Sequence, residues 1–163
     1  MDLDIKIREI EKSEIAELDN FLYEAIYNAE GQEKINREIT SLPELSRYVK
    51  DFGRENDICF VAELPGKLVG AIWTRIFTDE ERGYGYVDSK TPELSISVFK
   101  DYQQKGIGTN LLKTMIDKLT LCNYKQVSLS VDKQNYAFKL YQKFGFVILH
   151  SDEKSAIMVK RLK

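Results

Sequence analysis

Two glycines, Gly106 and Gly108, stand at the start of a predicted helix and shortly after a predicted strand. The first turn of a helix leaves backbone N–H groups without partners and carries a partial positive charge, so it can hold an anion without a cationic side chain. Because glycine has no Cβ, the backbone can approach that anion closely. The loop at residues 100–108 therefore predicts a phosphate or pyrophosphate site.

Two familiar phosphate-binding loops do not match this segment. A Walker A loop ends in Gly-Lys-Ser/Thr, and that ending is absent here. The dinucleotide fingerprint requires a third glycine three residues after the second, where this chain has Leu111. The predicted anion site therefore belongs to another kind of loop.

The elements that position this loop are a strand and a helix. Residues 93–99, Glu-Leu-Ser-Ile-Ser-Val-Phe, are a short apolar run with β-branched and aromatic members, which is typical of a strand. Apolar residues then recur at helical spacing, at Leu111, Leu112, Met115, Ile116 and Leu119.

The other segments give the order β-α-α-β-β-β-α-β-α-β-β, which is an α/β fold class. Ser13, Pro43 and Asn135 are suited to helix starts. Trp73 lies in an expected strand and is interpreted as a packing residue. The expected strands are 5–10, 58–62, 68–77, 93–99, 126–131, 146–149 and 156–159, and the expected helices are 13–29, 43–52, 109–119 and 135–144.

Length and composition limit the class of protein. With 163 residues, 43% hydrophobic and 31% charged, the chain is expected to form one globular domain, residues 1–163. A net charge of −2 gives no basic footprint for nucleic acid or an anionic membrane, so neither is expected as a partner. The start of the chain lacks the apolar stretch of a signal peptide and no run is long enough to span a bilayer, so we expect a cytoplasmic protein.

Metal chemistry is not expected. Cys59 and Cys122 are the only cysteines and His150 is the only histidine, and neither cysteine has a Cys or His neighbour. Both cysteines are interpreted as reduced thiols in the core.

Two motifs resemble those of the GNAT superfamily of N-acetyltransferases. The segment Gln103-Gln104-Lys105-Gly106-Ile107-Gly108 is similar to the Gln/Arg-x-x-Gly-x-Gly/Ala loop that binds acetyl-CoA in that family. Residues 135–146 are similar to the family segment Asn-x-x-Ala-x-x-Leu-Tyr-x-x-x-Gly-Phe, with one residue fewer between Asn135 and Ala137. The order of elements is also that of the family, so the resemblance covers nearly the whole chain.

The resemblance implies the GNAT fold and a place for acetyl-CoA. The fold is a mixed sheet of about seven strands and about four helices, which splays after the fourth strand. The pantetheine arm is expected in the gap, paired with the backbone of that strand, and the pyrophosphate on the N–H groups of the loop. The cofactor-binding residues expected from this are Ile96, Ser97, Val98, Gln103, Gln104, Lys105, Gly106, Ile107, Gly108, Thr109, Asn135 and Tyr141.

The chemistry of acetyl transfer assigns two further roles. A free alkylamine has a pKa near 10.4, so deprotonation at neutral pH costs roughly 4 to 5 kcal/mol and calls for a base. Glu93 matches the position of the base in several family members, and the alternative is a solvated carboxylate at a strand end. Tyr141 matches the family's general acid, which protonates the leaving thiolate. A backbone N–H of the strand, with Val98 as the candidate, is expected to stabilise the oxyanion.

The function implied is an acetyl-CoA-dependent N-acetyltransferase that acts on a primary amine by direct transfer in a ternary complex. Segments 28–40 and 151–155, with the loop at 78–92, hold an excess of acidic residues that could attract a cationic acceptor. The alternatives are a catalytically silent acyl-CoA-binding or interaction module of the same fold and a nucleotide-binding regulator. A homodimer is an option that the resemblance allows.

Overall fold

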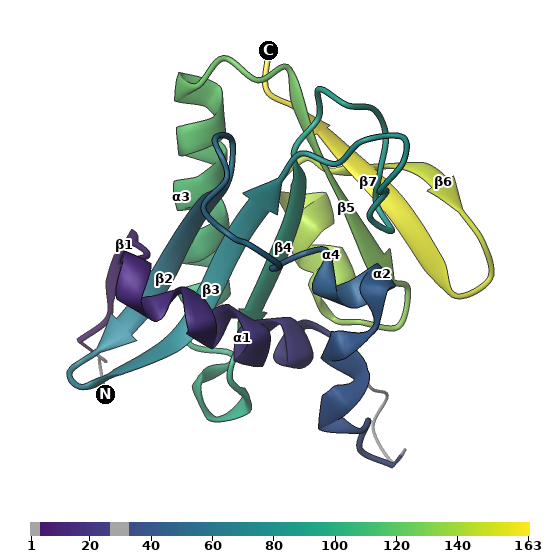
Figure 1. Cartoon of the computed structure of the whole chain (residues 1–163). Helices are drawn as coiled ribbons and strands as arrows, with labels where there is room; N and C mark the ends of the chain where they lie inside the picture. Colours follow the sequence, from purple (N-terminus) through teal and green to yellow (C-terminus); the bar gives the residue numbers. More distant parts are fainter. Residues whose placement is uncertain (1–3, 27–32) are drawn as a thin grey trace.

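The computed structural model describes residues 4–26 and 33–163, and these form a seven-stranded sheet with helices on both faces (Figure 1). The strand order across the sheet is β1-β2-β3-β4-β5-β7-β6. The strands are β1 Lys6–Glu9, β2 Ile58–Leu64, β3 Lys67–Arg75, β4 Glu93–Val98, β5 Gln126–Asp132, β6 Val147–Ser151 and β7 Ser155–Arg161. The expected fold class is therefore confirmed.

The helices divide between the two faces of the sheet (Figure 1). α1 and α2 cover one face, and α3 and α4 cover the other. The helices are α1 Leu18–Ala25, α2 Pro43–Ser46, α3 Ile107–Leu121 and α4 Ala137–Lys143, with 3₁₀ turns at η1 Lys12–Glu17, η2 Arg37–Ser41 and η3 Lys100–Tyr102.

Alternation along β3 produces a core on each face. Ala71 and Trp73 pack with Leu18 and Phe21 of α1, whereas Ile72 packs with the apolar side of α3. Trp73 is 1% exposed and its indole N–H donates to the carbonyl of Tyr48 at 3.2 Å, so its expected packing role is confirmed. β3 is thus buried on both faces and supports the strand beside it.

The sheet splits between β4 and β5. β3 and β4 pair along their length, from Arg75↔Glu93 to Gly70↔Val98. β4 and β5 are parallel and share only one register position, Glu93↔Ser128. On its other edge β5 pairs with β7 over its full length, from Gln126↔Arg161 to Asp132↔Ser155. The expected opening after the fourth strand is confirmed.

The first predicted helix, 13–29, is shorter than expected. It starts as the 3₁₀ turn η1, where Glu14 accepts from the backbone N–H of Glu11 and pairs with Arg8. α1 then ends at Ala25 because Ile26 turns to an extended ψ of 110°. Residue Ala29, predicted for the same helix face, lies outside the described residues.

The second predicted helix, 43–52, keeps only one α-helical turn, α2. The guanidinium of Arg75 donates to the carbonyls of Arg47 and Lys50, at 2.8 and 2.7 Å. An α-helix that reaches Phe52 needs a right-handed φ at Asp51, but Asp51 has a left-handed φ of 53°, so the segment continues as turns. The predicted inner face still packs on the sheet, through Leu45, Tyr48, Val49 and Phe52.

Arg75 itself forms a buried ion pair with Asp57, and its side chain is 1% exposed. Two guanidinium nitrogens, Nε and NH2, donate to the carboxylate at 3.1 and 2.8 Å. The ion pair therefore connects Asp57, in the segment after α2, to Arg75 at the end of β3.

Cys59 is buried as predicted, but Cys122 is exposed. It directly follows α3, where the chain turns through Asn123 at a φ of 66°, so the core interpretation is wrong for this residue. Within residues 4–26 and 33–163 no helix has the length and apolar character to cross a membrane.

We expect Asp57→Asn to lower the free energy of unfolding by about 3 kcal/mol or more, because it leaves the buried Arg75 charge without its carboxylate. Asp19→Asn is the matched control, since the Asp19–Arg37 pair is 47% and 44% exposed and should contribute under about 1 kcal/mol. Urea unfolding of both variants measures the difference. Equal losses in the two would contradict the structural role of the buried pair.

Candidate active site

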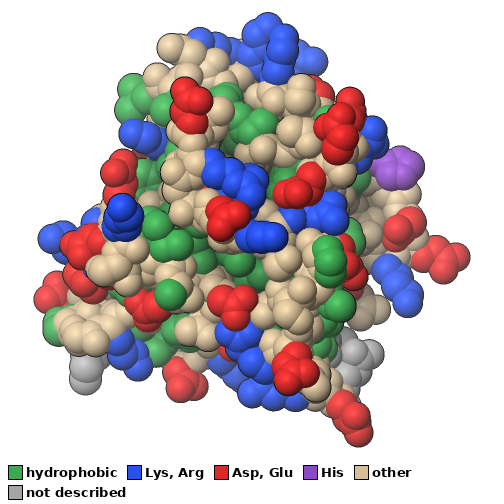
Figure 2. Space-filling model, in the orientation of Figure 1, with side chains coloured by type: hydrophobic (Ala, Val, Ile, Leu, Met, Phe, Trp, Pro, Cys, Tyr) green, Lys and Arg blue, Asp and Glu red, His purple; other side chains and the backbone are tan. Residues whose placement is uncertain are grey.

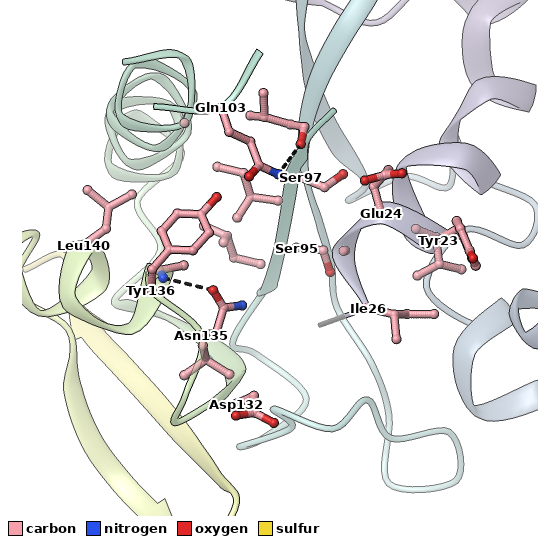
Figure 3. A pocket seen from close by; sticks show the side chains of 18 of the residues that line it. Tyr23, Glu24, Ile26, Ser95, Ser97, Gln103, Asp132, Asn135, Tyr136 and Leu140 are labelled. Carbon is pink, nitrogen blue, oxygen red and sulfur yellow. Dashed lines mark hydrogen bonds between the residues drawn. The ribbon is translucent and has the colours of Figure 1, made fainter. Parts of the chain in front are cut away.

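A cavity of about 1100 Å³ lies at the gap between β4 and β5. Figure 3 shows β4 passing through its centre, with α1 on one side and α3 and α4 on the other. Gln103, Asn135 and Tyr136 lie on the side of α3 and α4, and Tyr23, Glu24 and Ile26 lie on the side of α1. The cavity therefore has two halves that meet at one strand.

The start of α3 forms one end of this cavity. Gly106 has a φ of 85° and Gln104 a φ of 61°, so the loop turns sharply before the helix. The first helical bond runs from the N–H of Asn110 to the carbonyl of Gly106. The N–H groups of residues 107–109 are therefore the ones a helix start leaves without helical partners, and no described side chain caps them.

Space is left open in front of these N–H groups. A Cβ added at Gly106 or Gly108 would meet nothing within 4 Å, so no neighbouring protein group requires glycine there. The backbone is consequently accessible from the cavity, and an anion can reach it.

Ten of the twelve predicted cofactor residues line the cavity, and two do not. Lys105 is exposed outside it, and Ile107 is 3% exposed in the core beneath α3. The ten lining residues are Ile96, Ser97, Val98, Gln103, Gln104, Gly106, Gly108, Thr109, Asn135 and Tyr141.

The backbone of β4 presents alternate residues to the gap. Phe99 donates its N–H to the carbonyl of Val69 on β3 at 2.9 Å. Because hydrogen bonding alternates along an antiparallel pair, the N–H of Ser97 also faces β3, and those of Ile96 and Val98 face the gap. The N–H and C=O groups of Ser97 therefore face β3, whereas its predicted part in cofactor binding stays a prediction.

Some polar groups of the site already form hydrogen bonds within the protein. The Ser97 hydroxyl donates to the carbonyl of Phe21 at 2.7 Å and so ties α1 to β4. The amide of Gln103 donates to the carbonyl of Val98 at 2.9 Å. The amide oxygen of Asn135 accepts from the N–H of Ala137 at 2.9 Å, so this side chain helps to start α4.

Glu93 stands at the closed end of the gap and is 3% exposed. The hydroxyl of Tyr48 donates to its Oε2 atom. Burial raises the pKa of Glu93 from the ordinary value of 4.5 to about 7, although the hydrogen bond from Tyr48 and the backbone N–H of Gly85 both favour the charged form. A carboxyl with this pKa can accept and release protons near neutral pH.

Tyr141 enters the cavity from α4 and is 6% exposed. Its ring packs against Phe146 with the centroids 5.8 Å apart. Burial, with the nearby Tyr136, raises the pKa of Tyr141 above its ordinary value, so the phenol keeps its proton at neutral pH. Because a raised pKa also makes the phenol a weaker acid, proton donation by Tyr141 depends on close contact with the accepting atom.

Tyr48 is the site residue that sequence reasoning missed. It was predicted as part of an apolar helix face, and the structure does place its ring in the core. Its hydroxyl, however, meets a carboxylate 45 residues away in the chain. The pattern of a helix face gives no signal for such a contact.

The acidic segments that were expected near an acceptor contribute little to the cavity. Residues 78–83 and 151–155 are absent from its lining, and the acidic residues that do line it are Glu24, Glu93 and Asp132. Figure 2 shows acidic and basic side chains interspersed on the face in view. Glu30 lies outside the described residues.

The chain matches known acetyltransferases. The model of the family described as Acetyltransferase (GNAT) family matches residues 16–146. An N-alpha-acetyltransferase of Sulfurisphaera tokodaii is 35% identical over 124 residues, which cover 69% of this chain and 71% of that protein. A protein named "Probable N-acetyltransferase camello" in Xenopus tropicalis is 34% identical over 99 residues, and the match spans 60% of this chain and 42% of that relative.

A solved structure shows the same fold. The PaiA N-acetyltransferase of Thermoplasma acidophilum, in complex with coenzyme A, superposes with a TM-score of 0.65 at 23% identity. The match covers 98% of this chain and 99% of that one.

We expect Glu93→Gln to stabilise the protein at alkaline pH. Because the folded-state pKa of Glu93 is raised, its protonated form is favoured by folding, and this contribution is present below about pH 4.5 and lost as the pH rises to about 7. A neutral amide should therefore raise the free energy of unfolding by about 3 kcal/mol at pH 8 and leave it nearly unchanged at pH 4. Denaturant unfolding at the two pH values measures this. A pH-independent difference would show that burial does not penalise the charge.

Proposed function

Because this chain belongs to the GNAT family of acetyltransferases, we propose that it transfers an acetyl group from acetyl-CoA directly to a primary amine while both are bound. The observation that carries this proposal is the cavity divided by β4. One half has an anion-binding helix start, and the closed end has a titratable carboxyl. Donor and acceptor can therefore meet without a covalent enzyme intermediate.

The half beside α3 fits coenzyme A. The pyrophosphate would accept from the N–H groups at the start of α3, where the backbone is open to the cavity. The pantetheine arm has amide groups, and the backbone of Ile96 and Val98 faces the gap where it would lie. These contacts point the thioester toward the closed end, where β4 and β5 pair at Glu93.

Glu93 is the proposed base. An amine bound as its ammonium ion must lose a proton before its nitrogen can attack the thioester carbon. The carboxyl of Glu93 has a pKa of about 7, so a large fraction is charged at neutral pH and can accept that proton. The transfer runs directly or through a water molecule.

Tyr141 and Val98 serve the other two needs of the reaction. The oxyanion that forms when the amine attacks can accept from the N–H of Val98, which faces the gap. When the C–S bond breaks, the sulfur leaves as a thiolate, and the phenol of Tyr141 can give it a proton. A phenol is protonated at neutral pH, and because burial makes Tyr141 a weaker acid, this transfer requires the hydroxyl to lie close to the sulfur.

The acceptor half is mainly apolar and aromatic. Leu22, Tyr23, Ile26, Ile35 and Leu45 line it, with Glu24 and Lys34 as charged residues of opposite sign. This lining suits an aliphatic or peptide chain that carries an amine, and it gives little support to selection by negative charge alone.

We expect Gly106→Val to weaken acetyl-CoA binding by more than about tenfold, or about 1.4 kcal/mol. A side chain there would fill the space in front of the α3 N–H groups. Gly66→Val is the matched control, since Gly66 has a φ of 87° and is equally open but lies in the β2–β3 turn. Calorimetric titration measures both affinities. Equal affinities in the two variants would mean that the loop does not hold the cofactor.

The proposed reaction is tested by acetyl-CoA consumption against a panel of polyamines, amino sugars, amino acids and peptides, with products identified by mass. We expect Tyr141→Phe to lower kcat about a hundredfold or more with unchanged acetyl-CoA affinity, because the general acid is lost. Tyr124→Phe, outside the cavity lining, should match the wild type.

Two outcomes would contradict parts of this proposal. Acetyl-CoA binding without any acetylated product would favour the silent acyl-CoA-binding module. Full turnover in Tyr141→Phe would remove this residue from the mechanism.

A further inference from the structure

The hydroxyl of Tyr48 connects Glu93 to a loop that comes from another part of the chain. It donates to Oε2 of Glu93 and accepts from the backbone N–H of Tyr84 at 2.6 Å. A phenol has one proton to donate, and here the carboxylate receives it. The N–H of Tyr84 can only donate, so it bonds to the phenol oxygen while the phenol proton points to Glu93.

The loop around Tyr84 packs closely against the same carboxyl group. A Cβ added at Gly83 would lie 2.3 Å from Oε1 of Glu93 and 2.7 Å from the Tyr48 hydroxyl. A Cβ at Gly85 would lie 2.7 Å from the backbone of Leu129. Both positions therefore need glycine for the loop to cover Glu93 at this distance.

Tyr48 is itself held in place from several directions. Its ring meets Phe77 edge to face, with the centroids 5.0 Å apart. Its carbonyl accepts from the indole of Trp73, and the neighbouring carbonyl of Arg47 accepts from Arg75. The hydroxyl is thus presented to Glu93 by a fixed segment.

Other groups near Glu93 do not replace this hydrogen bond. Arg75 is the register partner of Glu93 on β3, but its guanidinium is paired with Asp57. Ser128 is the register partner on β5, and its buried hydroxyl makes no hydrogen bond within the described residues. Oε1 of Glu93 likewise has no hydrogen-bond partner among the described residues. Tyr48 is therefore the described side chain that orients the carboxylate, and the backbone N–H of Gly85 adds to the support of the charged form.

We propose that Tyr48 is a positioning residue that, with the close-packed loop at Gly83, fixes the Glu93 carboxylate in one orientation and favours its charged form through the donated hydrogen bond. The role in turnover depends on Glu93 being the base, as proposed above. The effect of Tyr48 on the titration of Glu93 does not depend on it, so the two can be tested separately.

The first experiment is a carbon-13 NMR titration of the glutamate carboxyl groups, in which Glu93→Gln identifies the Glu93 signal. In Tyr48→Phe the ring packing is kept and the donated hydrogen bond is lost, so the Glu93 midpoint should rise by about one to two pH units above about 7. In the pH profile of kcat, the acid limb should move to higher pH by the same amount. The affinity for acetyl-CoA should not change.

Two further variants complete the test. Gly83→Ala should raise the midpoint in the same direction, because its methyl group displaces both Glu93 and the Tyr48 hydroxyl, and it serves also if Tyr48→Phe folds poorly. Tyr86→Phe is the matched control, since its hydroxyl bonds to the exposed Asp79 at 3.0 Å and lies on the same loop. It should leave the midpoint unchanged.

The outcomes separate this proposal from the proposed function. A Glu93 midpoint that is unchanged in both Tyr48→Phe and Gly83→Ala would overturn the positioning role. If Glu93→Gln retains the acid limb of kcat, Glu93 is not the base, and the NMR titration still decides whether Tyr48 controls its charge. A midpoint that rises in both variants, with a parallel shift of kcat, supports both proposals.

Discussion

The separation of β4 from β5 after Glu93 and Ser128 is the constraint from which the site follows. A buried strand that loses its neighbour leaves backbone N–H and C=O groups without partners, which is unfavourable unless something else bonds to them. The side-chain amide of Gln103 donates a hydrogen bond to the carbonyl of Val98, and the N–H groups of Ile96 and Val98 still face the gap. A ligand with amide groups can complete the interrupted ladder, so the break in the sheet is itself the binding surface.

The closed end of the same gap explains why Glu93 is buried. Because β4 and β5 meet there, the carboxyl lies between two strands and beneath the loop that contains Gly83 and Gly85. Removal from water opposes its charge, and the Tyr48 hydroxyl partly restores it. The balance leaves a carboxyl that can exchange protons near neutral pH, at a cost to stability that a neutral residue would not have.

The two faces of β4 pack against different elements around the site. Ser97 is tied to α1 on one side, and Leu94 packs into the core beneath α3 on the other. The strand thus separates the proposed cofactor side from the proposed acceptor side, and the Arg75–Asp57 pair holds the segment that contributes Tyr48. Precise placement of groups from opposite faces depends on this central support.

Local patterns in the sequence determined the element order, the glycine loop before α3 and the candidates Glu93 and Tyr141. Strand periodicity, helix starts and the two motifs each depend on residues that are close together in the sequence. Tertiary structure decided the rest. The 43–52 segment forms turns after α2, where Asp51 has a left-handed φ of 53°, and the backbone of Ser97 faces β3. The contact of Tyr48 with Glu93 spans 45 residues, and only packing of α2 against the sheet brings them together. Periodicity reports which face a residue occupies, but not which distant partner it meets there.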